Sequence, residues 1–287
     1  MTYIRGFTFP NADKEHNFFM KTLRTCYDSY YPFQVLSAAG LEHVDFEPVT
    51  IFCGENGSGK STALNVIAEK AEVKRDSVFN KSNFYPDYLK LCTMDKDSDT
   101  PTDAKIITSD DVFDYMLNIR NLNEGIDLKR EEMFAEYLDV KYTQFQLKSI
   151  SDYEHLQKMN KARSKTQSRY VRGELISNVR EYSNGESAYR YFVDKIGENG
   201  LYLLDEPENS LSPERQTELA GLIEDSARFF GCQFIISTHS LFLLALRGAR
   251  IYDLDENPVK VKRWTELGNV RAYYEFFQSH ARDFRGK

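Results

Sequence analysis

Residues 54–62 read Gly-Glu-Asn-Gly-Ser-Gly-Lys-Ser-Thr. The first eight match the pattern G-x-x-x-x-G-K-[ST] of a phosphate-binding loop in full. Alternating and then apolar residues over 42–53 predict a strand before the loop, and an apolar stripe over 61–71 predicts a helix after it. Strand, glycine loop and helix are the context that this motif requires, so the stretch predicts an α/β fold of the P-loop NTPase type.

The residue types of this loop predict how it binds a nucleotide. Its glycines let successive backbone N–H groups turn toward one phosphate oxygen, and the following helix points its positive end at the same anion. Lys60 is expected to bridge the β- and γ-phosphates, and the Ser61 hydroxyl is expected to bind Mg²⁺. The residues expected to contact the nucleotide are Gly54, Asn56, Gly57, Ser58, Gly59, Lys60, Ser61 and Thr62.

Two further sites follow apolar runs that predict buried strands over 201–204 and 233–237. Asp205 is expected to hold Mg²⁺ through its water shell, and Glu206 to polarise the attacking water as general base. Such a pair alone is more often a solvated turn, but its place after a phosphate loop favours catalysis. His239 follows the second strand, where a phosphate sensor is favoured over a structural histidine.

Composition limits the function classes. The 287 residues carry a net charge of −7 and are 41% hydrophobic, which is typical of a globular protein. The longest run of Val, Ile, Leu, Met, Phe or Ala residues spans 241–246, far short of the about 20 that a membrane span needs. The N-terminus lacks the apolar stretch of a signal peptide, and four widely spaced cysteines predict free thiols. A cytoplasmic location is therefore expected.

The pattern along the chain predicts a core with an insertion. Strands alternating with helices predict a parallel sheet with helices on its faces, in which Ser212 and Pro213 begin one helix. Between Pro101 and Pro207 there is no proline, and apolar residues recur at helical spacing. We expect an ATPase core formed by residues 1–73 and 181–287, and an inserted helical arm over 74–180.

The order of these elements resembles a known family. Tyr182-Ser183-Asn184-Gly185-Glu186-Ser187 precedes Asp205 by about one helix and resembles the signature motif of ABC-type ATPases. Phosphate loop, helical arm, signature, Asp-Glu-Pro and histidine follow each other as in an ABC-type nucleotide-binding head. The resemblance spans residues 44–254. It is closest to SMC/RecF-like heads and to small standalone AAA-family ATPases that share Asp-Glu-Pro-Glu-Asn.

This resemblance implies a mechanism and its partners. In ABC-type heads the signature binds the γ-phosphate held by the opposite subunit, so Ser183 and Gly185 would act in trans on ATP. Two ATP molecules with Mg²⁺ would be buried in a head-to-tail homodimer that hydrolysis releases. The preference for adenine over guanine also comes from the resemblance.

The sequence departs from the family pattern in places. A clear glutamine is missing after the strand that follows the first helix, and Ser109-Asp110 is expected in that region, with Asp110 able to reach Mg²⁺ through water. Ser212 stands where ABC transporters carry aspartate, which disfavours a transporter motor. Three tyrosines are candidates for stacking on the adenine ring, and core packing explains them at least as well: Tyr27, Tyr30 and Tyr31.

Three surface patterns leave alternatives open. A basic strip without acidic residues is consistent with nucleic-acid binding, a solvated face, contact with ATP phosphates, or an acidic partner. It consists of Lys158, Lys161, Arg163, Lys165, Arg169 and Arg172. Aromatic residues over 273–277 predict a helix that packs on the core, or else a partner surface. Asp95, Asp97 and Asp99 fail the calcium-loop pattern and predict a solvated loop.

Together these patterns predict an ATP-hydrolysing, ATP-gated dimer in DNA-associated or defence machinery. The alternative is a regulatory ATPase subunit that controls a separate effector protein. The motor of a separate membrane transporter is the third interpretation.

Overall fold

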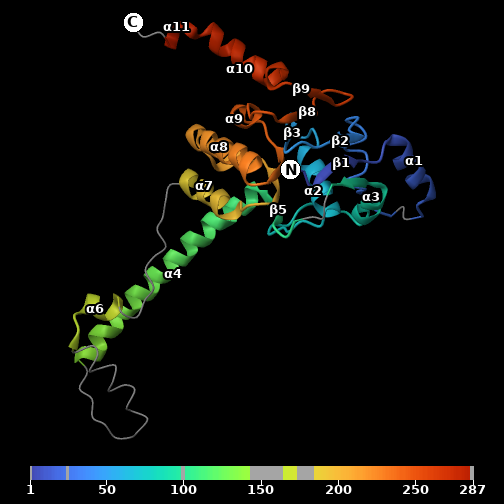
Figure 1. Cartoon of the computed structure of the whole chain (residues 1–287). Coiled ribbons are helices and arrows are strands. Elements are labelled where there is room, and N and C mark those ends of the chain that lie inside the picture. The colour runs from blue at the N-terminus through green and yellow to red at the C-terminus, as the bar shows by residue number, and fades with distance from the viewer. Residues whose placement is uncertain (1, 24–25, 98–100, 143–163, 173–183, 285–287) are drawn as a thin grey trace. The chain divides into compact units, whose positions relative to one another are not determined.

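The computed structural model describes residues 2–23, 26–97, 101–142, 164–172 and 184–284 (Figure 1). The chain forms two compact units, of which the first comprises Met1–Phe113 and Asn184–Lys287 and the second Asp114–Ser183. This division differs from the expected one, because residues 74–113 lie in the first unit rather than in the arm. The physical reason is that this segment contributes a strand to each of the two sheets of the first unit.

A six-stranded sheet with the order β5-β6-β7-β3-β8-β9 forms the centre of the first unit. Five strands are parallel, and β9 pairs antiparallel with β8. All residues of β3 and β7 are buried, as the apolar runs predicted. The parallel α/β architecture is thus confirmed. The strands are β3 (Val49–Cys53), β5 (Ala104–Thr108), β6 (Leu201–Asp205), β7 (Gln233–Ser237), β8 (Arg250–Asp253) and β9 (Lys260–Lys262).

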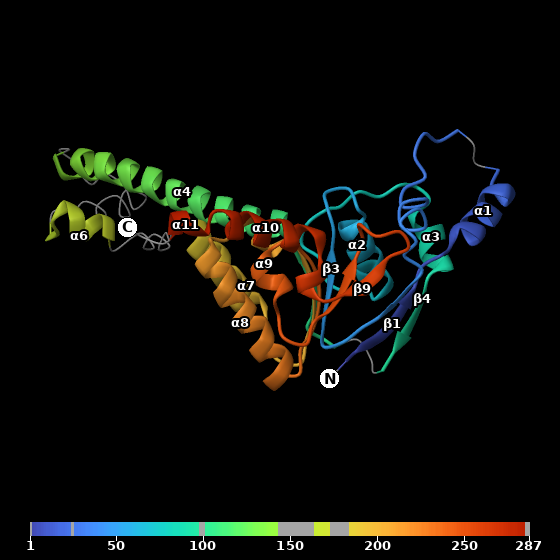
Figure 2. The same ribbon diagram turned by 90° about the horizontal axis from the view of Figure 1, so that it is seen from above.

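Helices cover both faces of this sheet (Figure 2). Helix α2 (Lys60–Lys70) packs against β6 and β7 on one face, and α8 (Pro213–Phe229) packs against β7 on the other, beside α7 (Asn184–Lys195) and α9 (Leu241–Leu244). The Ser212 hydroxyl accepts a hydrogen bond from the Arg215 amide at 3.4 Å and so caps α8, as predicted.

A three-stranded antiparallel sheet, which the sequence did not predict, lies on the α2 side of the main sheet (Figure 2). Its order is β2-β1-β4, with β1 at Ile4–Thr8, β2 at His43–Asp45 and β4 at Thr93–Lys96. The apolar core joins this sheet to α2, α1 (Ala12–Lys21) and α3 (Tyr85–Leu91). The predicted strand over 42–53 is therefore divided between two sheets.

The second unit is helical where it is described. It contains most of the long helix α4 (Ser109–Tyr142) and the short helix α6 (Gln167–Arg172), as the interpretation of an arm predicted. A small cluster of Met133, Tyr137, Tyr170 and Val171 holds the two helices together. Within the described ranges, none of the helices is both long and apolar enough to span a bilayer.

The C-terminal segment forms the 3₁₀ turn η3 (Trp264–Glu266), α10 (Gly268–Ser279) and α11 (Ala281–Phe284). Val270 is buried, but Tyr273, Tyr274, Phe276 and Phe277 are each at least 49% exposed. The prediction that these aromatic residues pack on the core is therefore wrong, and they form an exposed apolar surface on α10.

Candidate nucleotide-binding and catalytic site

The phosphate loop connects the carboxyl end of β3 to α2, as predicted. Gly57 and Gly59 have φ angles of 89° and 97°, a region that only glycine adopts without strain. A side chain at Gly59 would also lie 3.1 Å from Leu36. The Ser58 hydroxyl is buried and has no hydrogen-bond partner among the described residues. Positive φ angles at the glycines of such a loop are the backbone geometry by which successive amides turn toward an anion.

Lys60 lies across this loop. Its side chain is 4% exposed, and its Nζ donates to the carbonyl oxygens of Gly54 at 2.8 Å and Glu55 at 3.0 Å. The same nitrogen is 3.7 Å from Glu206 Oε1. The lysine is thus already held over the loop, with the expected general base beside it.

Asp205 and Ser61 meet although 144 positions separate them in sequence. The Ser61 hydroxyl donates to Asp205 Oδ1 at 2.9 Å, and the Ser237 hydroxyl donates to the same oxygen. Burial raises the pKa of the Asp205 carboxyl, against the lowering effect of these two hydrogen bonds. The sequence does not predict a role for Ser237, because it looks like an ordinary strand residue. Its position opposite Asp205 arises only from the pairing of β7 with β6.

Asp205→Asn is expected to raise the melting temperature of the metal-free protein at pH 7 by a few degrees. A raised carboxyl pKa means that ionisation costs folding free energy, and this cost is complete once the pH exceeds the folded pKa. The amide keeps an oxygen that accepts from Ser61 and Ser237. Thermal unfolding in EDTA measures the effect, with exposed Asp110→Asn as control. A lower melting temperature for Asp205→Asn alone would contradict this account.

Glu206 adopts a strained backbone conformation. Its φ and ψ are 48° and 54°, a left-handed conformation that is rare outside glycine. The side chain is 24% exposed, and its Oε2 accepts a hydrogen bond from Asn209 at 3.0 Å. The carboxylate thus lies beside Lys60 and within reach of water, as the general-base hypothesis requires.

His239 follows β7 and is held by a buried glutamate. Glu208 Oε1 accepts from the Thr238 hydroxyl at 2.7 Å and from the His239 amide at 2.9 Å, and lies 3.4 Å from His239 Nδ1. The sequence analysis includes Glu208 only within Asp-Glu-Pro-Glu-Asn and predicts no role for it. The sequence signal for Glu208 is its place two residues after Glu206, in Asp-Glu-Pro-Glu-Asn.

Strand β5 brings a third segment to the same edge of the sheet. Thr108 pairs with Asp205 in the register of β5 and β6, so Ser109 and Asp110 follow at the metal side. A pocket of about 400 Å³ is lined by Ser61, Asp205, Ser109 and Asp110 together. The segment expected in place of the missing glutamine therefore borders the expected metal position.

The three tyrosines considered for adenine lie in different surroundings. Tyr30 packs with its ring centroid 4.6 Å from that of Phe84, within the core, and Tyr27 lies against the same ring at 5.3 Å. Tyr31 instead donates its hydroxyl hydrogen to Thr62 Oγ1 at 3.1 Å, which puts it next to the phosphate loop. Tyr31 remains the candidate with a direct contact to the loop.

The predicted signature is described in part. Ser183 lies outside the described residues, whereas Gly185 begins α7 together with Asn184. A Cβ at Gly185 would be 3.7 Å from the Ser210 carbonyl oxygen, an ordinary contact. The amino end of α7 therefore lies beside the segment that follows Asp-Glu-Pro.

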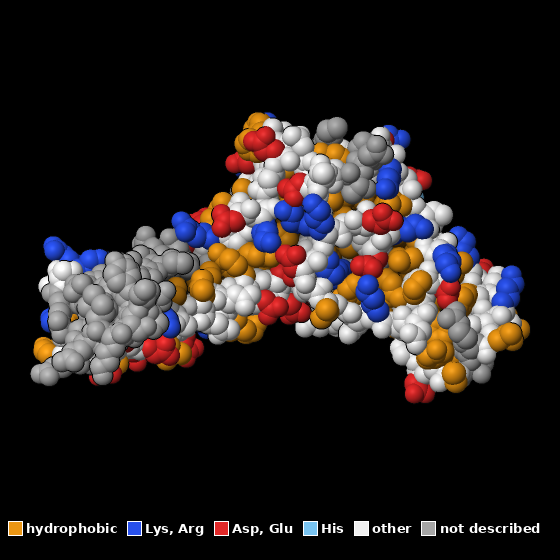
Figure 3. Space-filling view, turned by 90° about the horizontal axis from the view of Figure 1, so that it is seen from below, with side chains coloured by type: hydrophobic (Ala, Val, Ile, Leu, Met, Phe, Trp, Pro, Cys, Tyr) orange, Lys and Arg blue, Asp and Glu red, His pale blue; other side chains and the backbone are white. Residues whose placement is uncertain are grey.

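The basic strip is also described in part. Lys158, Lys161 and Arg163 lie outside the described residues, while Arg169 and Arg172 are exposed on α6. On the face shown in Figure 3, lysine and arginine side chains alternate with acidic ones over the described residues. The acidic segment predicted as a solvated loop is partly strand, because Asp95 lies within β4, and Asp97, directly after β4, forms an ion pair with Arg5 of β1 at 2.5 Å.

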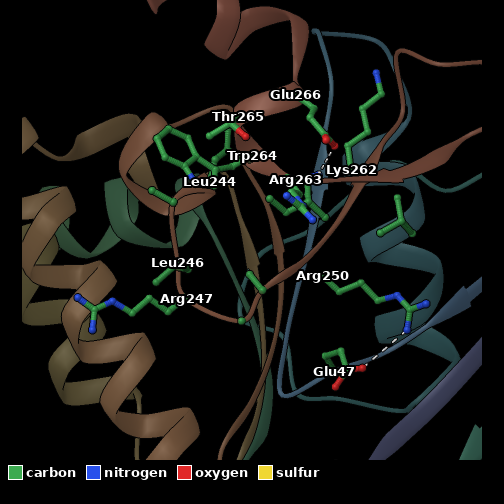
Figure 4. Close-up of a pocket in the computed structure, with 15 residues that line it drawn as sticks. Glu47, Leu244, Leu246, Arg247, Arg250, Lys262, Arg263, Trp264, Thr265 and Glu266 are labelled. Carbon is green, nitrogen blue, oxygen red and sulfur yellow. Dashed lines mark hydrogen bonds and ion pairs between the residues drawn. The ribbon is translucent and has the colours of Figure 1, made fainter.

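A hollow of about 790 Å³ lies away from this site (Figure 4). Its lining includes Glu47, just before β3, and Arg250, at the start of β8, which form an ion pair at 3.8 Å. These are the amino ends of parallel strands, whereas ligands of such sheets bind at the carboxyl ends. The phosphate loop therefore does not border this hollow.

The residues present fit a magnesium nucleotide. Mg²⁺ prefers oxygen ligands and is usually held by one or two carboxylates together with substrate phosphates. Ser61 and Asp205 offer such oxygens in direct contact, and Lys60 and the loop amides offer donors to phosphate. The buried Ser58 hydroxyl, which lacks a partner, lies in the same loop. Among the described residues there is no cluster of three or more histidine, cysteine or acidic side chains that suits another metal site.

Two family models match the chain. The model described as ABC transporter matches residues 43–209, more than half of the chain. A second model, for an AAA domain whose description names the AbiEii toxin of a Type IV TA system, matches residues 176–245. No curated protein matches.

The comparison with solved structures gives matches at low identity. One is a dimeric ATP-binding cassette in a post-hydrolysis state with bound ADP and Pi, with 16% identity over 78% of this chain and 90% of that chain and a TM-score of 0.36. Another is the SMC head domain from Thermotoga maritima, with 14% identity over 77% of this chain and 92% of that chain and a TM-score of 0.37.

Proposed function

Because the chain belongs to the ABC transporter family and is an ATPase with a P-loop core, we propose that two copies bind two ATP molecules head to tail and that hydrolysis opens this dimer. The contact between the phosphate loop and the Asp205-Glu206 pair carries the proposal. Ser61 bonds to Asp205, and Lys60 lies beside Glu206, at the carboxyl edge of the sheet. This arrangement puts phosphate binding and water activation within one cluster.

The side chains divide the reaction between them. The loop amides and Lys60 hold the phosphates, with Lys60 exchanging its present bonds to loop carbonyls for phosphate oxygens. Glu206 accepts a proton from the attacking water, and His239 senses the terminal phosphate. Mg²⁺ held by Ser61 and Asp205 would neutralise phosphate charge.

The dimer follows from the position of the signature. Gly185 is at the first turn of the 12-residue helix α7, whose N-terminus favours an anion. A second copy placed head to tail would direct this helix end at the γ-phosphate held by the first copy. Hydrolysis removes the group that both copies bind, which provides a reason for opening.

Gly185→Asp tests this arrangement. A side chain fits without a close contact, and aspartate is favoured in the first turn of a helix, so the variant should fold and bind ATP as a monomer. Its negative charge would repel the γ-phosphate of the opposite copy and prevent ATP-dependent dimers. Analytical ultracentrifugation with ATP, in the Glu206→Gln background, measures this, with Gly185→Ala as the uncharged control. A stable ATP-dependent dimer of Gly185→Asp would refute binding in trans.

We place this ATPase in DNA-associated or defence machinery. Support comes from the basic strip, including exposed Arg169 and Arg172, and from the toxin–antitoxin wording of the second family description. Glu206→Gln protein should bind DNA in the presence of ATP and Mg²⁺, and this binding should weaken steeply with salt. Absence of DNA binding at low salt, with or without ATP, would contradict this role.

The exposed aromatic surface on α10 favours a second candidate, in which the ATPase holds and releases an effector protein. In that case ATP-locked protein should retain a stoichiometric protein partner without nucleic acid. A motor for a separate membrane transporter is disfavoured, because Ser212, in place of the aspartate of transporters, serves as the cap of α8.

A further inference from the structure

The pocket of about 400 Å³ beside Ser61 and Asp205 contains one basic side chain among its lining residues, Arg75. Arg75 follows α2, in the segment over 74–113 that the sequence analysis assigns to the arm. Its neighbours in the lining include Asn65 and Phe79. The expected metal ligands and a guanidinium group therefore line the same pocket.

Packing fixes the Arg75 side chain in place. It is 11% exposed, its Nη2 donates to Asn65 Oδ1, and its guanidinium lies 4.0 Å from the centre of the Phe79 ring. Arg75 Nε forms a long ion pair with Glu69 Oε1 at 3.9 Å, a distance too great for a hydrogen bond. The orientation of the group is thus determined by Asn65 and Phe79 and not by a close carboxylate.

Two of the three guanidinium nitrogens lack an acceptor. Nε and Nη1 of Arg75 are buried and have no hydrogen-bond partner among the described residues. The ion pair with Glu69 offsets part of the charge, but buried donors without a hydrogen-bond acceptor remain costly, so they indicate a partner that binds in the functional state. The acids of the pocket do not fill this role, because Asp205 accepts from Ser61 and Ser237, and Asp110 is exposed.

We propose that Arg75 binds a phosphoryl oxyanion in this pocket, next to the metal ligands. The inference rests on the proposed function, which supplies such an anion in two forms: the terminal phosphate of bound ATP, or inorganic phosphate after hydrolysis. A planar guanidinium with two free edges suits phosphate oxygens, and Asn65 and Phe79 hold it ready.

The experiment compares Arg75→Gln and Arg75→Lys with Lys81→Gln. Lys81 is a matched control, because it lies 4.4 Å from the same Phe79 ring and pairs with the same Glu69 at 3.1 Å, but is half exposed and does not line this pocket. Calorimetry measures the affinity of each protein for ADP, for a non-hydrolysable ATP analogue, and for inorganic phosphate added to the ADP complex.

Arg75→Gln is expected to keep its affinity for ADP and to lose about 10- to 100-fold in affinity for the analogue, for phosphate, or for both. Loss for the analogue identifies the terminal phosphate as the partner, and loss for phosphate identifies the product. Arg75→Lys should retain part of the affinity, and Lys81→Gln should match the wild type. Unchanged affinity of Arg75→Gln for both ligands would overturn the proposal, as would an equal loss in Lys81→Gln.

A crystal structure of the wild-type protein with ADP, Mg²⁺ and vanadate decides the matter if the variants do not fold. A vanadate oxygen within hydrogen-bond distance of Arg75 Nε or Nη1 is expected, and both nitrogens turned away from it would overturn the proposal. A wild-type protein that binds no ATP would contradict the proposed function instead. In that case the affinity for inorganic phosphate, measured without nucleotide, would be compared between wild type and Arg75→Gln. A weaker affinity in Arg75→Gln would support the role of Arg75, and an equal affinity would overturn it.

Discussion

Glu206→Gln protein is expected to bind ATP normally and to lose about 100-fold or more in kcat, the contribution of a general base. The carboxylate lies 3.7 Å from Lys60 Nζ, and the amide has the same shape but does not accept a proton from water. Because the terminal phosphate then persists, the variant should accumulate as an ATP-bound dimer. Steady-state phosphate release and sedimentation with ATP and Mg²⁺ measure the two effects.

The control for this change is Glu214→Gln, on the exposed first turn of α8, which should hydrolyse ATP like the wild type. Normal turnover by Glu206→Gln would contradict the assignment of the general base. Loss of turnover without dimers would leave Glu206 catalytic and contradict the ATP-gated dimer.

Lys60→Ala should lose about 100-fold or more in ATP affinity, because two charge-assisted hydrogen bonds to phosphate disappear. In the present structure Lys60 donates two hydrogen bonds to loop carbonyls, which shows that its ammonium group reaches across the loop. Equilibrium binding of a fluorescent ATP analogue measures the loss, and the control is Lys260→Ala, whose exposed ammonium pairs with Glu256.

Thermal unfolding accompanies this measurement, since Lys60 is buried. Wild-type affinity in a folded Lys60→Ala protein would rule out the loop as the phosphate site. A lowered melting temperature with unchanged affinity would show that Lys60 serves the loop conformation alone.

The sequence was sufficient where neighbouring residues make the structure. Residues 54–62 form the predicted loop between β3 and α2, and the strands after residues 200 and 232 were correctly predicted from their apolar runs. The small antiparallel sheet was missed because β2 and β4 have three and four residues, too few for a clear alternation. Of these short strands, β4 lies within residues 74–113, which the sequence analysis assigns to the arm.

The candidate site was predictable in its members but not in its contacts. Asp205 and Glu206 were expected near the loop because parallel strands end at one edge of a sheet. Ser237 and Arg75 were not predicted, since neither a serine within a strand nor a single arginine after a helix forms a motif. Glu208 was visible in the sequence, but its bonds to Thr238 and His239 depend on β6 lying next to β7.

The sequence by itself determined the phosphate loop, the parallel α/β core and the family, because these depend on consecutive residues and on the periodicity of apolar side chains. The tertiary structure decided what surrounds the phosphates. The order β5-β6-β7-β3 brings Asp110, Asp205 and Ser237 to the loop, and the segment after α2 brings Arg75. Contacts between residues far apart in the chain arise from strand pairing and helix packing, and a local pattern does not contain that information.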